Sequence, residues 1–156
     1  MLDALHQVAD VPTRFNGYPV GTRAGQLPGV EAVRQREQPA TSSDQFLRLF
    51  GKPMRLLSCE CERNNEPTMN QAFHLLSGPA LHDLLVEPQN RLTRLLQSRS
   101  SEADLVAELY WTALSRPPSE REIAAARGHL TLGNRRAALE DLTWALMNAK
   151  EFLLRK

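Results

Sequence analysis

The sequence contains little of several residue types that would by themselves point to a function. Only two cysteines occur in 156 residues, at Cys59 and Cys61, which excludes a disulfide framework. Aromatic residues make up 6% of the chain, so few rings are available to stack on sugars. The formal net charge is +1, and no overall field therefore favours nucleic acid, an anionic membrane or acidic substrates.

Several motifs are also absent. No stretch approaches the roughly 20 apolar residues of a membrane-spanning helix. The chain lacks the Gly-x-Ser-x-Gly elbow, a phosphate-binding glycine loop and the His-Glu-x-x-His zinc motif. It has no Cys-x-x-Cys-His sequence, so we expect no attached haem and no cofactor in this chain. The N-terminus, MLDALHQVADVPTRF, has no signal-peptide pattern, which predicts a cytoplasmic location if the chain is a complete product.

The length and the apolar content are those of one soluble domain with its own core. Residues 1–67 are rich in proline and glycine and show no strict alternation, which predicts a loop-rich flank. Residues 68–156 show helical periodicity and predict the core. The expected fold is therefore all-α, an irregular multi-helix bundle in a single domain over 1–156.

The pattern predicts short helices over 2–8, 43–50, 79–86 and 90–97. The helix from Thr68 to Leu76 is better specified, because Thr68 and Gln71 form a capping-box pattern. Its apolar residues then fall on one face at i, i+3, i+4 and i+7, namely Met69, Ala72, Phe73 and Leu76.

Three longer helices are expected downstream. Ser101 and Asp104 open the first, which ends near Leu114. Ser119 and Glu122 form a second capping-box pattern, which opens another helix to about residue 130. The last helix runs from Arg135 to about Leu154 with a heptad-like seam of Leu139, Leu142, Leu146, Ala149 and Leu153. We expect Trp111 and Trp144 to pack where these helices meet.

The segment MRLLSCECER is the densest polar cluster. If it is extended, the two cysteines point one way and the two glutamates the other. We interpret it as a structural cluster in which the thiols pack inward and the glutamates pair with arginine; its members are Arg55, Cys59, Glu60, Cys61 and Glu62. A zinc site would need four ligands, and only His74 adds a third, so no metal site is predicted.

A second set of residues is a candidate for ligand binding. Asn70, Gln71 and His74 share the polar side of the predicted helix, and Arg63 and Glu66 precede it. A solvated or interface histidine is the simpler interpretation of His74. Arg23, in a Gly-Thr-Arg turn, is a further candidate that could bind an anion or hydrogen-bond to loop carbonyls. Acid–base catalysis by Glu60, Glu62 or Glu66 requires a geometry that loop residues do not fix, so no catalytic residue is assigned.

Five blocks of the sequence together resemble a known family. They are YPVGTRAGQLP, FLRLFGKPMR, CECERNNEPTMNQAFHLLSGP, ELYWTALSRPPSEREI and ALEDLTWALMNAKEF. In this order they are similar to the C-terminal part of a planctomycete domain of unknown function, which accompanies c-type cytochrome domains in large exported proteins.

The resemblance implies an exported or cell-surface setting. Its expected partners are the upstream part of the same domain or neighbouring cytochrome-type domains in longer relatives; no nucleic acid is expected. Three functions follow as hypotheses: a non-catalytic module for assembly or scaffolding, a polysaccharide- or small-ligand-binding module, and a fragment of a carbohydrate-active enzyme that uses Glu62, Arg63, Glu66 and His74. The oligomeric state is not predicted.

Overall fold

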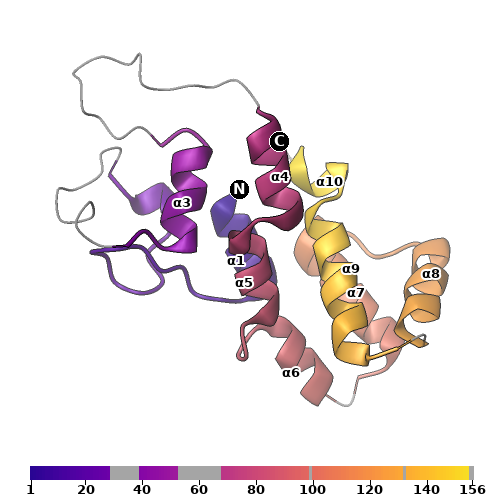
Figure 1. Ribbon diagram of the computed structural model, residues 1–156. Coiled ribbons are helices and arrows are strands. Elements are labelled where there is room, and N and C mark those ends of the chain that lie inside the picture. Colours follow the sequence, from indigo (N-terminus) through magenta and orange to yellow (C-terminus); the bar gives the residue numbers. More distant parts are fainter. Residues whose placement is uncertain (29–38, 53–67, 99, 132, 155–156) are drawn as a thin grey trace. The chain divides into compact units, whose positions relative to one another are not determined.

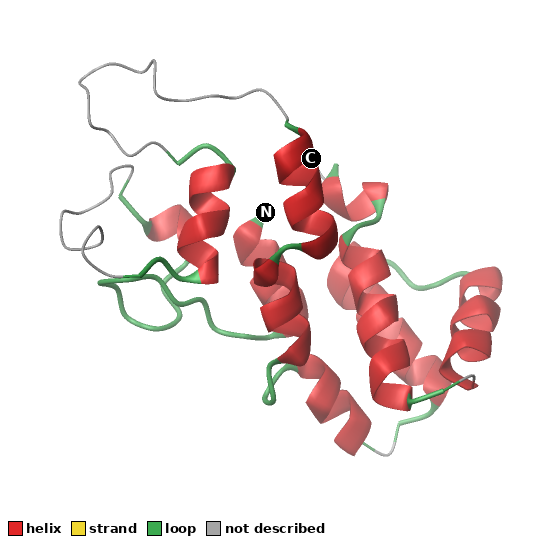
Figure 2. Cartoon of the chain, viewed as in Figure 1, coloured by secondary structure: helices red, strands yellow, loops and turns green. Residues whose placement is uncertain are grey.

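The computed structural model describes residues 1–28, 39–52, 68–98, 100–131 and 133–154, and the regular elements in these ranges are all helical (Figure 2). No strand occurs within them. The elements are α1 Leu2–Ala9, the 3-10 helix η1 Ala24–Gln26, α3 Ser42–Leu49, α4 Met69–Ser77, α5 Pro79–Val86, α6 Arg91–Gln97, α7 Glu102–Leu114, α8 Glu120–Thr131, α9 Arg135–Met147 and α10 Lys150–Leu153 (Figure 1). The predicted all-α fold class is confirmed.

The chain forms two compact units, and α1 and α5 each contribute residues to both. One unit comprises Met1, residues 7–11 and residues 84–156. The other comprises residues 2–6 and 12–83. The predicted single domain, with its flank ending at residue 67, stays a prediction.

Helix α7 forms the centre of the first unit, where it packs with α8, α9 and α10. Its start is fixed by Ser101 and Asp104, the two residues predicted to open it, which form a capping box: the Ser101 amide donates to the Asp104 carboxylate at 3.2 Å, and the Asp104 amide donates to the Ser101 hydroxyl at 3.3 Å. The apolar stripe that follows is buried throughout, and comprises Leu105, Val106, Leu109, Ala113 and Leu114. Each fully buried leucine contributes about 1.5–3 kcal/mol, so this stripe is a principal source of the unit's stability.

The last predicted helix is wrong in its length. Helix α9 ends at Met147, Asn148 caps it, and Ala149 is extended with φ −64° and ψ 141°. The short helix α10 then begins at Lys150. In the expected seam Leu139 and Leu146 are buried, whereas Leu142, Ala149 and Leu153 are only half-buried; the last two lie beyond the end of α9.

The prediction for the two tryptophans is also wrong. Trp111 is 53% exposed and Trp144 is 38% exposed. Both lie on the side of their helix away from its buried stripe, since Leu109 and Ala113 of α7 and Leu139 and Thr143 of α9 occupy the inner positions. The helical phase, set by the smaller apolar residues, therefore places each indole outward.

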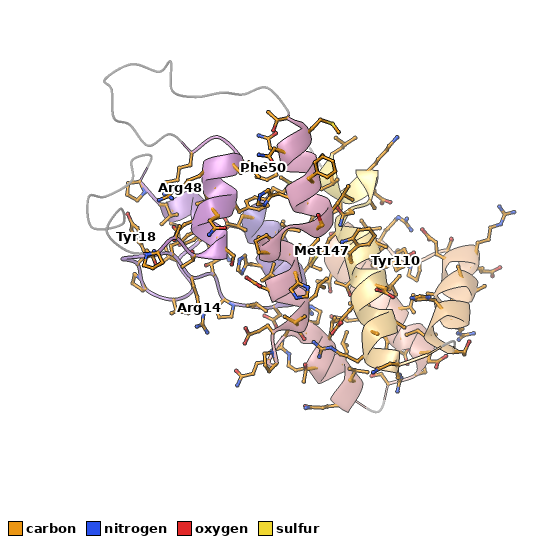
Figure 3. The ribbon with its side chains drawn as sticks, in the orientation of Figure 1. Arg14, Tyr18, Arg48, Phe50, Tyr110 and Met147 are labelled. Atoms are coloured by element: carbon orange, nitrogen blue, oxygen red, sulfur yellow. The ribbon has the colours of Figure 1, made fainter. Side chains whose placement is uncertain are left out.

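In the second unit, apolar side chains from α1, α3, the start of α5 and the connecting segments form the core. The main buried residues are Leu2, Leu5, Phe15, Phe46 and Leu81. Phe46 stacks on Phe50 with ring centroids 4.2 Å apart and planes 12° from parallel; Phe50 is labelled in Figure 3. Asp44, at the start of α3, accepts amide hydrogens from Thr41 and from Asn16, so it joins the helix to the preceding loop.

Candidate functional site

The most unusual surface of the second unit is the apolar face of α4. Met69 is 73% exposed, Phe73 is 58% exposed and Leu76 is 48% exposed. These residues stand at i, i+4 and i+7 and therefore lie on one side of the helix. No residue of α4 is buried. We call Met69, Ala72, Phe73 and Leu76 the α4 face.

Helix α4 is nevertheless well fixed at its start. The Thr68 amide donates to the Gln71 side chain at 3.1 Å, and the Gln71 amide donates to the Thr68 hydroxyl at 3.2 Å, so the predicted capping box is confirmed. The Gln71 side chain also donates to the Leu49 carbonyl at the end of α3, at 3.0 Å. The helix thus begins at a defined place beside α3.

The end of α4 depends on glycine. The Gly78 amide donates to the His74 carbonyl at 3.0 Å. A Cβ atom at Gly78 would lie 2.2 Å from that carbonyl oxygen, well inside van der Waals contact. Pro79 then begins α5, so a tight turn joins the two helices.

The structure describes three of the five predicted binding residues. Asn70 is exposed and His74 is half-buried, both on α4 as expected. Arg23 precedes η1 and is exposed; its amide donates to the Gln26 side chain at 2.9 Å. Within the described ranges no hydrogen bond or ion pair joins Arg23 to Asn70 or His74.

The other predicted residues lie outside the described ranges. They are the two remaining binding candidates, Arg63 and Glu66, and the whole structural cluster of Arg55, Cys59, Glu60, Cys61 and Glu62. The predicted latch and the predicted ligand strip therefore stay predictions. In the described part of the chain, no group of three or more histidine, cysteine or acidic residues could hold a metal ion.

A serine and a histidine also meet in the second unit. The Ser43 hydroxyl lies 3.3 Å from Nε2 of His6, a distance compatible with a nucleophile and its base. Ser43 is only 4% exposed, however, so in this arrangement an external carbonyl group cannot reach its hydroxyl. The pair joins α1 to α3, and we interpret it as a structural hydrogen bond.

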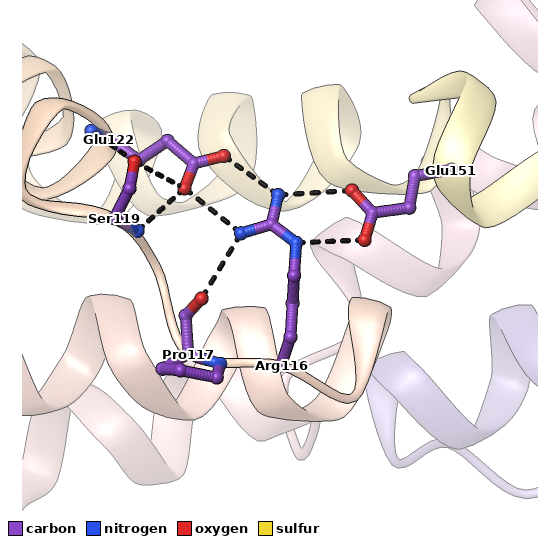
Figure 4. A network of polar contacts seen from close by, with 5 residues as sticks. All are labelled: Arg116, Pro117, Ser119, Glu122 and Glu151. Carbon is purple, nitrogen blue, oxygen red and sulfur yellow. Dashed lines mark hydrogen bonds and ion pairs between the residues drawn. The ribbon is translucent and has the colours of Figure 1, made fainter.

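The most highly connected polar cluster lies in the first unit, around Arg116 (Figure 4). Its guanidinium binds the Glu151 carboxylate through Nε at 2.8 Å and Nη2 at 3.0 Å. It binds the Glu122 carboxylate through Nη1 at 3.0 Å and Nη2 at 2.9 Å. Nη1 also donates to the Pro117 carbonyl at 3.1 Å. These bonds use all five N–H donors of the arginine, so none is left to bind a ligand.

The carboxylate of Glu122 is also the cap of α8. It accepts the Ser119 amide at 2.7 Å and the Ser119 hydroxyl at 2.8 Å, which confirms the second predicted capping box. The hydrogen bonds from Arg116, with those from Ser119, lower the pKa of Glu122 to about 2. The hydrogen bonds from Glu122 and Glu151 in turn raise the pKa of Arg116 above its ordinary value.

Tyr110 lies beneath this cluster, with the Arg116 guanidinium carbon 5.5 Å from its ring centre; the residue is labelled in Figure 3. Burial, and then the charge of Glu122, raise the pKa of its hydroxyl. The sequence prediction found the capping role of Glu122 but missed Arg116. The available signal was an arginine directly before two prolines and a capping box. From that position its side chain can contact the carboxylate at the start of the next helix.

None of the helices in the described ranges is both long enough and apolar enough to cross a membrane.

No curated protein matches the chain, and no solved structure matches it. One family model does match, over residues 22–130, and its description is PSD1, protein of unknown function (DUF1553). The matched segment begins before η1 and ends within α8, so it includes α4 and both residues of the capping box, Ser119 and Glu122. Because the match covers more than half of the sequence, the chain belongs to the PSD1 (DUF1553) family.

Proposed function

We propose that the chain is a non-catalytic helical module for assembly, and that the α4 face is the surface with which it binds a neighbouring domain. The observation that carries this proposal is the exposure of Met69 and Phe73 on a helix with no buried residue. Contact of two large apolar side chains, one turn apart, with water is unfavourable, so a partner that covers them stabilises the complex.

The chemistry of the α4 face defines the kind of partner. Residues 69–77 contain no aspartate, glutamate, lysine or arginine. An uncharged apolar helix face of another domain is therefore its best complement, because a charged partner would be desolvated without a counter-ion. Helix-in-groove recognition uses the same i, i+4 and i+7 spacing of anchors.

The size of the α4 face favours a partner in the same polypeptide. A helix of nine residues is only about 13 Å long at roughly 1.5 Å per residue. Its one apolar side buries far less than the ~800 Å² that each partner contributes to a stable independent complex. A covalently linked domain needs less area, because tethering raises the effective concentration to the order of millimolar.

The upstream part of the domain, or a cytochrome-type domain, is the partner that the family resemblance suggests. Export or a cell-surface location belongs to the same proposal, as does the planctomycete origin of the longer relatives. The exposed apolar face supports an assembly role in such a protein.

Hydrogen exchange tests the proposal in a longer protein in which this chain follows its upstream portion. The amides of α4 should exchange at least about tenfold more slowly there than in the isolated chain, since docking adds a local opening cost of 1.4 kcal/mol or more. Met69→Ser/Phe73→Ser should abolish the difference. Leu154→Ser replaces an apolar side chain that is 72% exposed and lies outside α4. This control variant should leave the difference in exchange intact. Equal exchange of α4 in the two proteins would refute the proposal.

Ligand binding is the second candidate function, in the form of a polysaccharide- or small-ligand-binding module or a fragment of a carbohydrate-active enzyme. Its support is the placement of Asn70 and His74 four residues apart on α4, where both can contact one ligand. Glu62, Arg63 and Glu66 would complete that site. Titration with oligosaccharides, followed through the His74 ring resonances, tests it; no shift at saturating sugar would eliminate this candidate.

A further inference from the structure

Helix α10 is the shortest α-helix of the first unit and is joined to α9 by a very short connection. It comprises four residues and follows α9 after only Asn148 and Ala149. Ala149 is extended, so the hydrogen-bond ladder of α9 does not continue into α10. A short connection of this kind allows a small element to leave as a unit when its few tertiary contacts are broken.

Two residues anchor α10. Phe152 is 5% exposed, in a helix that packs on α7 and α9. Glu151 makes the bidentate pair with Arg116 described above. The flanking side chains contribute less, since Leu153 is half-buried and Leu154 is 72% exposed. An aromatic anchor beside a bidentate ion pair is the pattern of a bound peptide.

The receiving surface is held by residues outside α10. If Glu151 left, Arg116 would keep its two bonds to Glu122 and its bond to the Pro117 carbonyl. Tyr110 would remain below the guanidinium. The arginine is therefore already oriented for a carboxylate, with Nε and one Nη2 hydrogen available to it (Figure 4).

We propose that α10 is an exchangeable clamp, and that the surface of α7 and α9 that it covers binds the same segment of a second copy of this chain. The second copy is the natural occupant because its Glu151 and Phe152 make identical contacts and no new interface has to be formed. The connection at Asn148–Ala149 acts as the hinge. This inference does not depend on the proposed role of α4.

A labelled peptide with the sequence of residues 149–156 tests the receiving surface by fluorescence anisotropy. In wild type, the chain's own α10 competes, so binding should be weak. In full-length Phe152→Ala the competitor is weakened, and binding should be at least about tenfold tighter. A peptide carrying the Phe152→Ala change should not bind. Equal binding to wild type and variant, or none to a variant with wild-type circular dichroism, would overturn the proposal.

If Phe152→Ala does not fold, Glu151→Gln replaces it, because this change removes the charge of one anchor and keeps the buried ring. The peptide should then bind more tightly than it binds wild type, by a smaller factor. Equal affinity for Glu151→Gln and wild type would again contradict an exchangeable clamp.

Mixing two variants tests the second copy as the source of the segment. Phe152→Ala provides an intact receiving surface, and Arg116→Gln provides an intact segment with a damaged surface. Sedimentation velocity should show each variant alone as a monomer and the mixture as a heterodimer. Peptide binding without a heterodimer would show that the surface accepts the segment but that a second copy does not supply it, and would overturn the exchange.

Discussion

Helices α4 and α7 begin with the same local signals but differ in the burial of their apolar sides. Each begins at a capping box, Thr68 with Gln71 and Ser101 with Asp104, and each carries one apolar side. In α7 that side is buried against neighbouring helices, and Leu105, Val106 and Leu109 are 0% exposed. In α4 no residue is buried. Periodicity thus fixes which residues share a face, whereas burial depends on whether a partner is present.

The difference assigns the two helices different roles. The α7 stripe holds its unit together, since covered apolar surface is the dominant favourable term in folding. On the α4 face Met69 and Phe73 are more than half exposed, so these two side chains add little to the fold of this chain and remain available to another surface. Substitutions at comparable positions of the two helices should therefore have very different consequences.

The largest effect is expected from shortening the core of α7. Leu109→Ala removes a fully buried side chain and should cost about 2–5 kcal/mol in unfolding free energy, from lost transfer energy and the cavity left behind. Urea denaturation followed by circular dichroism measures it. Trp111→Ala on the same helix is the matched control: its side chain is 53% exposed, and it should stay within about 0.5 kcal/mol. Equal losses for the two would remove the distinction between inner and outer faces of α7.

The next effect sharpens the comparison from the side of α4. Gly78→Ala forces a Cβ atom against the His74 carbonyl oxygen, and the required backbone shift should cost about 1–3 kcal/mol. Gly128→Ala, within α8, meets nothing within 4 Å and should instead stabilise by about 0.4–1 kcal/mol. Differential scanning fluorimetry should therefore show opposite shifts of Tm. A shift of the same sign for both variants would contradict the tight turn after α4.

A smaller, pH-dependent effect belongs to the Arg116 cluster. The pKa of Glu122 is lowered from 4.5 to about 2 in the folded chain. The stability that this carboxylate adds is therefore fully present above pH 4.5 and is lost as the pH falls toward 2. Tm measured across this range should fall less steeply for Glu122→Gln than for wild type. Glu120→Gln, two residues from Glu122 at the start of α8, should keep the wild-type slope. If it also flattens the profile, the effect is one of net charge.

The sequence predicted the features that depend on neighbouring residues. The predicted capping boxes at Thr68 and Ser119 are formed, and Ser101 and Asp104 open α7 as predicted, because each start needs only side chains three residues apart. The apolar stripe of α7 was likewise readable from its spacing. The ion pair of Arg116 with Glu151 was not, because Glu151 is 35 residues away along the chain.

The other errors have two origins. The helical phase of the α7 stripe already places Trp111 outward, whereas the expectation for this residue followed its apolar character alone. The break after Met147 has only Asn148 as its signal, and the residues beyond it continue an apolar pattern that suits a longer helix. Tertiary contacts of Phe152 and Glu151 decide where α10 lies.

The exposure of the α4 face is the central claim, and the unfolding free energy of Met69→Ser/Phe73→Ser in the isolated chain tests it most directly. Because both side chains are more than half exposed, the double variant should unfold within about 0.5 kcal/mol of wild type in urea. A loss of about 2 kcal/mol or more, the size expected for buried side chains, would show that this face belongs to the core of the chain and is not available to a partner.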